Sequence, residues 1–473
     1  MYRKIHRNSI QIVSKWFIPI FLLSLLLVSA CGKEQGNPDT NQKTAIKVMY
    51  WDEPSYFNSF GDLFAMKYPH IEVEVVSTWE LQKGGDSKQA LEKFIEREQP
   101  DVLMLDSRQF EQLSPSGKLL ELEPLIQRDQ YDVDSIFPNL VELLKEKGEG
   151  RLYGLTPVFQ GSVLYYNADL FTRYGVEFPH DGMTWQEVID TARRFPVEGD
   201  ENTRIYGFGD QYPLSWESLI LTMNSTYGLK LQNEQTGKLS INTPAWKNIY
   251  QLALKGWESG AIYTERDSLS LGDGSMEDYY RRQLFLMGRI AMVVGDQSLL
   301  SRLDAARQNV RDIDVFEVGM VGGPVDPAAP EYTRDISLRG IYSIRADSPR
   351  VDAAWEWIKF INGEDYARIR SRTINNGLLS RMDYSKEFHG HSLEKFYMLK
   401  PKLGDGIIMY DAPPGVANEL FKLSEREMML VLDKKKTLDE ALQTIESEGQ
   451  AALEQAKSEQ VRAAEEENDK KLD

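Results

Sequence analysis

Short apolar segments alternate with amphipathic ones between residues 46 and 105, and this alternation restricts the folds open to the chain. Strand-like runs lie at 46–51, 71–76 and 102–105, and the second alternates apolar and polar side chains. Between them, apolar residues at helical spacing lie within 57–64 and 91–95. A β-α-β-α-β order predicts a mainly parallel sheet covered by helices on both faces. We therefore expect the α/β class.

Three later helices carry start signals. Thr184–Glu187 and Thr437–Glu440 match the capping box, in which the first and fourth side chains bond each other's backbone N–H groups. Ser348-Pro349 predicts the start of a third helix, because proline suits the first helical turn. Beyond these, residues 461–473 form a charged tail that we expect to be a solvated helix fraying at its end.

The first 30 residues have the order of a secretory signal peptide. Residues 1–15 carry four basic side chains and no acidic one, and an apolar run and small residues follow. The alternative is a membrane anchor, but Trp16–Ala30 has only 15 residues, against roughly 20 needed to cross a bilayer. We expect residues 1–30 to be removed.

The single cysteine, Cys31, directly follows Leu27-Val-Ser-Ala30. This segment resembles the lipobox of bacterial lipoproteins, which implies that Cys31 is lipidated and becomes the first residue. A buried free thiol is the alternative, but a polar stretch follows at 32–38. The resemblance implies a flexible tether over 31–44 and a lipid anchor in the cell membrane, with the protein on the extracellular face.

Charge and cysteine content exclude several classes of protein. The chain has 55 basic and 73 acidic residues, a formal net charge of −18. That sign disfavours nucleic acid and polybasic membrane binding, both of which need clustered positive charge. With one cysteine, no intramolecular disulfide and no cysteine-based metal cage can form.

Familiar catalytic and cofactor motifs are missing from the sequence. It has no phosphate-binding loop, no His-Glu-x-x-His, no Gly-x-Ser-x-Gly and no calcium loop. His389 and His391 supply only two metal ligands on a polar segment, which falls short of a closed site. We expect no cofactor, no metal and no catalytic residue.

Aromatic residues make up 11% of the chain, with nine tryptophans. Aromatic faces stack on the C–H surfaces of sugars, while polar side chains bond the hydroxyl groups. Trp185 and Trp355 lie on apolar helix faces, so we assign them to core packing. Trp51 and Trp216 stand beside polar residues where loops are expected, so ligand contact and core packing both stay open for them.

Seven segments in order resemble the extracellular solute-binding proteins of ATP-driven carbohydrate importers, the group that includes maltose-binding protein. The resemblance runs over almost the whole mature length, and its most specific part is Tyr153-Gly-Leu-Thr-Pro157 through Leu164-Tyr-Tyr-Asn167 to Thr184–Glu187. The other segments are Ile46–Asp52, Tyr68–Val73, Pro100–Leu122 and Phe285–Met292.

The resemblance implies a two-lobe, periplasmic-binding-protein-like (Venus flytrap) fold, with a hinge and a ligand cleft between the lobes. The chain would cross between lobes near 156–161, 338–342 and 389–392. The implied domains are 45–158 plus 341–388 for lobe one and 159–340 plus 389–460 for lobe two.

The resemblance also carries over a set of candidate ligand-binding residues. These candidates are Trp51, Asp52, Glu53, Asp106, Ser107, Arg108, Gln160, Gln211, Tyr212, Trp216 and Arg339. Phe159 and Asp335 are further candidates near the implied hinge. Leu105 and Gln297 stand where the family often has aromatic residues, which argues against maltodextrin as the ligand.

The implied function is a monomeric, membrane-anchored binding lipoprotein that captures an oligosaccharide or sugar derivative and delivers it to an ATP-binding-cassette permease. One alternative is a binding protein for a non-sugar solute, such as a peptide or polyamine. Another is a surface glycoside hydrolase, which is disfavoured because no carboxylate stands in a recognisable acid/base motif.

Overall fold

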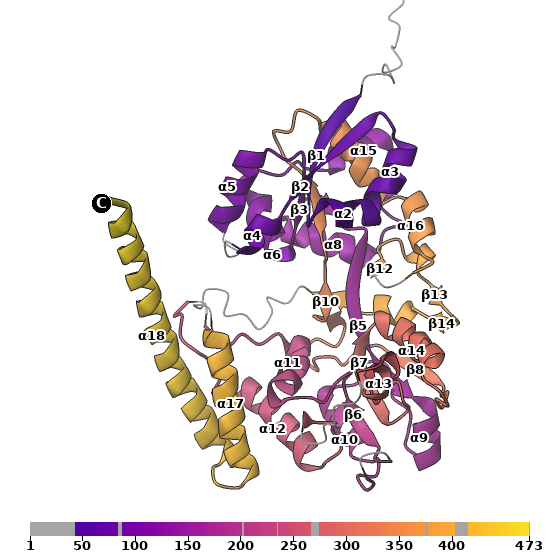
Figure 1. Ribbon diagram of the computed structural model, residues 1–473, viewed down its shortest axis with the longest axis vertical. Coiled ribbons are helices and arrows are strands. Elements are labelled where there is room, and N and C mark those ends of the chain that lie inside the picture. The colour runs from indigo at the N-terminus through magenta and orange to yellow at the C-terminus, as the bar shows by residue number, and fades with distance from the viewer. Residues whose placement is uncertain are drawn as a thin grey trace, which may run out of the picture.

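The computed structural model describes residues 43–83, 88–200, 203–233, 235–265, 274–373, 377–402 and 415–472. The expected signal peptide, Cys31 and nearly all of the tether lie outside these residues. Figure 1 shows two halves stacked along the long axis, each built around one sheet. We call these sheets the upper sheet and the lower sheet.

The upper sheet has the order β2-β1-β3-β11-β4. Its strands β1, β2 and β3 are parallel and are the three strands predicted first, while β11 is antiparallel to both β3 and β4. The mixed α/β class is thereby confirmed. Their bounds are β1 Thr44–Tyr50, β2 Ile71–Ser77, β3 Val102–Leu105, β4 Gly154–Leu155 and β11 Ile341–Ile344.

Helices cover the upper sheet because their apolar residues fall on one side. Leu91, Phe94 and Ile95 are all buried, as the helical spacing predicted, and so are Phe60 and Phe64. The helices are α2 Glu53–Tyr56, α3 Asp62–Lys67, α4 Trp79–Lys83, α5 Lys88–Glu98, α6 Ser107–Leu113, α7 Glu123–Asp129, α8 Pro138–Lys147, α15 Val351–Ile361 and α16 Glu364–Arg370, with a π-helical turn, Phe57–Gly61, joining α2 to α3.

The lower sheet is organised around the ten-residue strand β5, Val158–Asn167, which runs down from the upper half (Figure 1). The sheet has the order β10-β5-β7-β6, and β8 and β12 also pair with β5. The bounds are β6 Tyr206–Gly209, β7 Ile290–Asp296, β8 Val318–Val321, β10 Ile336–Ser337 and β12 Leu378–Leu379.

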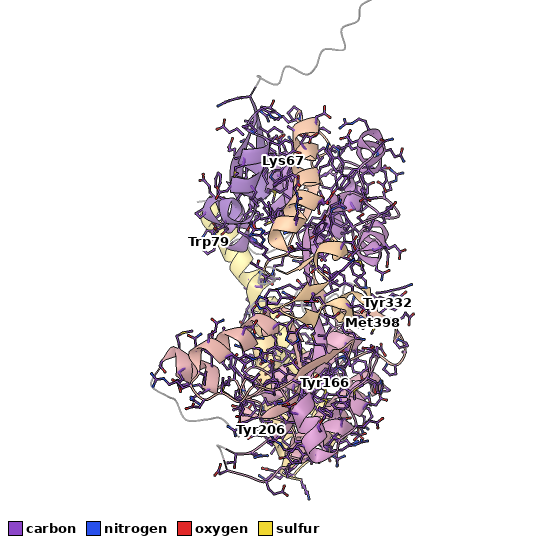
Figure 2. All side chains as sticks on the ribbon, turned by 90° about the vertical axis from the view of Figure 1, so that its right-hand side faces the viewer. Lys67, Trp79, Tyr166, Tyr206, Tyr332 and Met398 are labelled. Atoms are coloured by element: carbon purple, nitrogen blue, oxygen red, sulfur yellow. The ribbon has the colours of Figure 1, made fainter. Side chains whose placement is uncertain are left out.

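The lower half holds the remaining long helices. They are α9 Ala168–Tyr174, α10 Trp185–Ala192, α11 Trp216–Tyr227, α12 Pro244–Glu258, α13 Met276–Arg281, α14 Ser298–Asn309, α17 Val416–Leu432 and α18 Leu438–Leu472. Small pairs are β9 Tyr332–Thr333 with β15 Lys400–Pro401 and β13 Glu387–Phe388 with β14 His391–Ser392. The side chains labelled in Figure 2, such as Trp79 above and Tyr206 below, mark the two halves from the side.

The helix start signals are largely confirmed. Thr184 and Glu187 form the predicted capping box, and Thr437 bonds Glu440 in the same way. The third prediction is off by two residues, because helix α15 begins at Val351 rather than at Pro349. The Ser348 hydroxyl bonds a neighbouring carboxylate instead of capping this helix. Trp185 and Trp355 are fully buried, which confirms their assignment to packing.

The C-terminal helices form a hairpin against the lower half. Glu446 and Gln450 of α18 accept hydrogen bonds from the backbone N–H groups of Ile241 and Leu239, and Leu453 is buried beside them. The helix continues to Leu472 and reaches the height of α5 (Figure 1). In the part of the chain that the structure describes, no helix is both long and apolar enough to cross a membrane.

Three connections join the two halves within the described residues. The chain leaves the upper sheet between β4 and β5 and returns between β10 and β11, through residues 338–340, which we call the crossing segment. It passes to the lower half again within residues 380–402, where Arg381 bonds the Asn362 carbonyl above and Lys395 bonds Asp181 below. One hydrophobic cluster continues from the upper sheet through Phe159 and Tyr165 of β5 into the lower half. The exact lobe boundaries stay a prediction.

A buried carboxylate fixes the returning chain. Asp101 is fully buried, and its oxygens accept hydrogen bonds from the Lys47 backbone N–H at 2.8 Å and the Ser348 hydroxyl at 2.7 Å. The Arg350 guanidinium lies 3.4 Å from the same carboxylate. Asp101 thus links β1, the start of β3 and the entry to α15.

We expect Asp101→Ala to lower the free energy of unfolding by about 3 kcal/mol, because it leaves buried donors without a partner. Asp101→Asn keeps an acceptor oxygen and should cost less. Urea denaturation measures both variants, with Asp62→Ala, at an exposed carboxylate on α3, as the control. A loss for Asp101→Ala no larger than that of the control would contradict this account.

Asp335, just before β10, should make the stability of the folded state depend on pH. Burial raises the pKa of its carboxyl group, against a smaller opposite effect of a hydrogen bond with Ser162. The ionised form is therefore less favoured in the folded than in the unfolded chain, which costs stability at neutral pH. This cost is absent below the unfolded pKa, about 3.9, and grows as pH rises to the higher folded pKa.

We accordingly expect Asp335→Asn to raise the melting temperature at pH 7 and to leave it unchanged near pH 3.5. Melting curves at several pH values test this, with Asp314→Asn at an exposed carboxylate as the control. A gain for Asp335→Asn that is the same at every pH would show that its burial is not the cause.

Candidate ligand-binding cleft

A cavity of about 660 Å³ lies where the three parallel strands of the upper sheet end. Open α/β sheets bind ligands at the carboxyl ends of their strands. The lower sheet contributes to the same cavity through β5 and β10. The lining residues are Met49, Trp51, Thr78, Leu81, Met104, Leu105, Asp106, Gln109, Gln160, Ser337, Leu338 and Arg339.

Trp51 gives the cavity an accessible aromatic face. It directly follows β1, its side chain is 44% exposed, and its backbone carbonyl accepts a hydrogen bond from the Ser77 hydroxyl. This bond ties the residue after β1 to the end of β2. Leucine and methionine side chains form the apolar remainder of the wall. An exposed indole beside polar groups suits a flat ligand with apolar and hydroxylated edges.

Asp106 lines the cavity, but its carboxylate is engaged. It caps helix α6, accepting the Gln109 backbone N–H at 2.7 Å, while the Gln109 side chain accepts the Asp106 N–H at 3.0 Å. The reciprocal bonds hold both side chains in one geometry. Asp106 and Gln109 therefore form a fixed polar rim at the end of β3.

Strands β5 and β10 and the crossing segment make the opposite wall. Gln160 of β5 pairs with Ser337 of β10, and Arg339 follows on the crossing segment. Thr78, which follows β2 of the upper sheet, is 5% exposed, and its hydroxyl has no hydrogen-bond partner within the described ranges. A buried hydroxyl without a partner is costly, which makes Thr78 a candidate for bonding a ligand or water.

Several predicted site residues lie close to the cavity without lining it. Asp52 caps α2 by accepting the Ser55 N–H at 2.8 Å, and Glu53 follows it in the first turn. Ser107 and Arg108 begin α6, directly after Asp106. Asp52, Glu53, Ser107 and Arg108 therefore lie just after β1 and β3. Of the predicted set, the residues that line the cavity itself are Trp51, Asp106, Gln160 and Arg339.

Gln211 and Tyr212 lie at the corresponding edge of the lower sheet. They come just after β6, whose last residue, Gly209, pairs with Val293 of β7. The Gln211 side chain accepts a hydrogen bond from Arg302 of α14, and Tyr212 is 49% exposed. Both stand outside the cavity in this conformation.

Two predicted contacts are wrong. Trp216 is 1% exposed and packs against Trp257 and Tyr250, with ring centroids 5.5 and 6.2 Å away. Because Ser215 caps α11, Trp216 is its first residue, and its side chain turns into the core against α12. Phe159 is also 1% exposed and stacks on Phe137 within the core.

The polar lining residues that sequence reasoning missed are Thr78, Gln109 and Ser337. Thr78 follows β2, so the strand-end rule that selected Trp51 would have found it. Gln109 stands three residues after Asp106, a visible capping-box spacing. Asp335 lies beside the hinge but does not line the cavity. No group of three or more potential metal-ligating side chains occurs in the described residues.

Comparison with known proteins gives the family. The sequence pattern of the bacterial extracellular solute-binding proteins matches residues 50–368. A binding protein of Brucella abortus (strain 2308) is 24% identical over 247 residues, 50% of this chain and 54% of that protein. A binding protein of Brucella suis biovar 1 matches to the same extent. The chain thus spans about half the length of the curated relatives it matches.

Solved structures show the same fold. An extracellular solute-binding protein from Alicyclobacillus acidocaldarius has a TM-score of 0.60 and 15% identity, covering 88% of this chain and all of that one. A sugar transporter from Rhizobium etli in an open conformation has a TM-score of 0.58 and 17% identity, covering 86% and 99%.

A substrate-binding protein from Listeria monocytogenes in complex with cycloalternan has a TM-score of 0.53 and 19% identity, covering 86% of this chain and 98% of that one. The architecture and the sequence pattern agree, and the pattern extends over more than half of the chain. The chain therefore belongs to the bacterial extracellular solute-binding protein family.

Proposed function

We propose that this protein binds an oligosaccharide or sugar derivative and delivers it to the permease of an ATP-binding-cassette importer, without converting it chemically. The observation that carries this proposal is the cavity at the strand ends. It combines the exposed face of Trp51 with polar groups from Gln160, Ser337 and Arg339. Aromatic stacking surrounded by hydrogen-bonding groups is the chemistry that sugar recognition requires.

Closure of the two halves would complete the site. The upper and lower sheets are joined by short links, an arrangement suited to hinge motion. Gln211 and Tyr212 stand at the lower sheet edge that faces the hinge, so closure would bring them toward Trp51 and Asp106. The closed form would then enclose the ligand from both sides.

We further propose that the mature chain is monomeric and is held at the membrane by a lipid on Cys31, on the extracellular face. The sequence around Cys31 supports this, as does the polar, glycine-containing composition of residues 32–44. A lipid anchor would keep the binding protein beside its permease, so that captured ligand need not diffuse far.

A thermal-shift screen of the purified protein against oligosaccharides, peptides and polyamines tests the ligand class. A ligand that binds only the folded state stabilises it by about 2.7 kcal/mol at a concentration 100 times its dissociation constant. We expect a shift with saccharides, which are recovered unchanged after overnight incubation. A shift with peptides or polyamines alone would overturn the sugar assignment, and newly formed products would overturn the binding role.

Trp51→Ala should weaken saccharide binding by about tenfold or more, because stacking on one large apolar side chain contributes about 1–3 kcal/mol. Titration calorimetry measures the affinity. Trp79→Ala provides a matched control, since Trp79 is 59% exposed in the same half but does not line the cavity (Figure 2). Equal affinities for the wild type and Trp51→Ala would remove Trp51 from the site.

A further inference from the structure

We propose that the ligand is an acidic saccharide, and that Arg339 recognises its carboxylate. This inference rests on the proposed function and specifies the charge of the ligand. Among the described lining residues, only Asp106 and Arg339 carry ionisable groups. The two groups differ in their hydrogen-bond partners, and this difference determines whether the cavity favours a cationic or an anionic ligand.

The Asp106 carboxylate is engaged in a helix cap. One oxygen accepts the Gln109 backbone N–H, and the N-terminal end of α6 stabilises the negative charge. Binding a cationic ligand through Asp106 would compete with this cap. Asp106 therefore acts as a fixed part of the wall rather than as a free anion.

Arg339 has no such partner. Its side chain is exposed, and no carboxylate within the described ranges forms an ion pair with it. The acidic residues beside the hinge are themselves engaged: Asp335 hydrogen bonds with Ser162, and Asp296 accepts the Ser298 N–H at 2.9 Å. Of the two charged groups among the described lining residues, the guanidinium is therefore the one without a hydrogen bond or ion pair within the described residues.

The backbone on both sides of Arg339 is fixed. Ser337 pairs with Gln160 of β5, and Ile341 pairs with Leu105 at the end of β3. Leu338, between them, is buried. Arg339 is thereby held at the wall where upper and lower sheets meet. A guanidinium offers parallel N–H donors that match the two oxygens of a carboxylate, which a neutral sugar hydroxyl cannot use equally well.

The test compares ligands that differ in charge but not in shape. Uronic acid di- and trisaccharides, of galacturonate, glucuronate and mannuronate, are titrated against their methyl esters and neutral counterparts by calorimetry. We expect at least one acid to bind about 10- to 100-fold more tightly than its methyl ester, the range for a charge-assisted hydrogen bond. Arg339→Gln should abolish this preference, and Arg339→Lys should retain part of it.

Arg173→Gln, at an exposed arginine on α9, serves as the control and should keep the full preference. The melting temperatures of all variants without ligand establish that they are folded. Preferential binding of neutral saccharides, or an acid preference that survives in Arg339→Gln, would overturn this inference while the proposed function stands. If no saccharide of either charge binds, both the inference and the proposed function fail.

Discussion

The pairing of β11 between β3 and β4 is the constraint on which the rest of this structure depends. After β4 the chain forms strands β5 to β10 in the lower half, and only then returns to the upper sheet as β11, which is fully buried. Asp101 secures this return, because its carbonyl accepts the Arg345 N–H and its carboxylate accepts the Ser348 hydroxyl. Because β11 is hydrogen-bonded on both sides, the backbone of the crossing segment just before it is held in place. This segment forms part of the cavity wall.

This arrangement suits the proposed closure of the two halves, in which each half moves as a rigid body. Each sheet packs against its own helices, whereas residues 156–157, the crossing segment and the stretch 380–402 connect the two halves. A hinge needs only a few backbone dihedral angles to change while the packed parts move as bodies. The strand ends of both sheets face these connections, so the closure proposed above would act directly on the residues that would contact the ligand.

The sequence predicted the parts that local periodicity determines, and it failed where tertiary packing decides. Strands β1 to β3 and the capping boxes follow from spacing alone. The strand-end rule selected Trp51 and the family resemblance selected Asp106, and both line the cavity. Trp216 was misassigned because its neighbours are polar, although its own position, first in a capped helix, turns it into the core. Thr78 was overlooked because its only signal is its place after a strand, and the strand-end rule was applied to aromatic residues alone. Side-chain direction depends on neighbours distant in sequence, which periodicity does not contain.

The net charge of the whole chain differs from the local charge that a ligand contacts inside the cavity. The chain carries a net charge of −18, which alone would favour a cationic ligand. Exposed charges, however, are screened beyond about 8 Å at physiological salt, and many of the acidic residues lie on helix faces or in the tail. At contact distance the cavity presents a capped aspartate and an unpaired arginine. If the proposed function holds, the local pairing of charges around Arg339, rather than the net charge of the chain, would determine which saccharides bind.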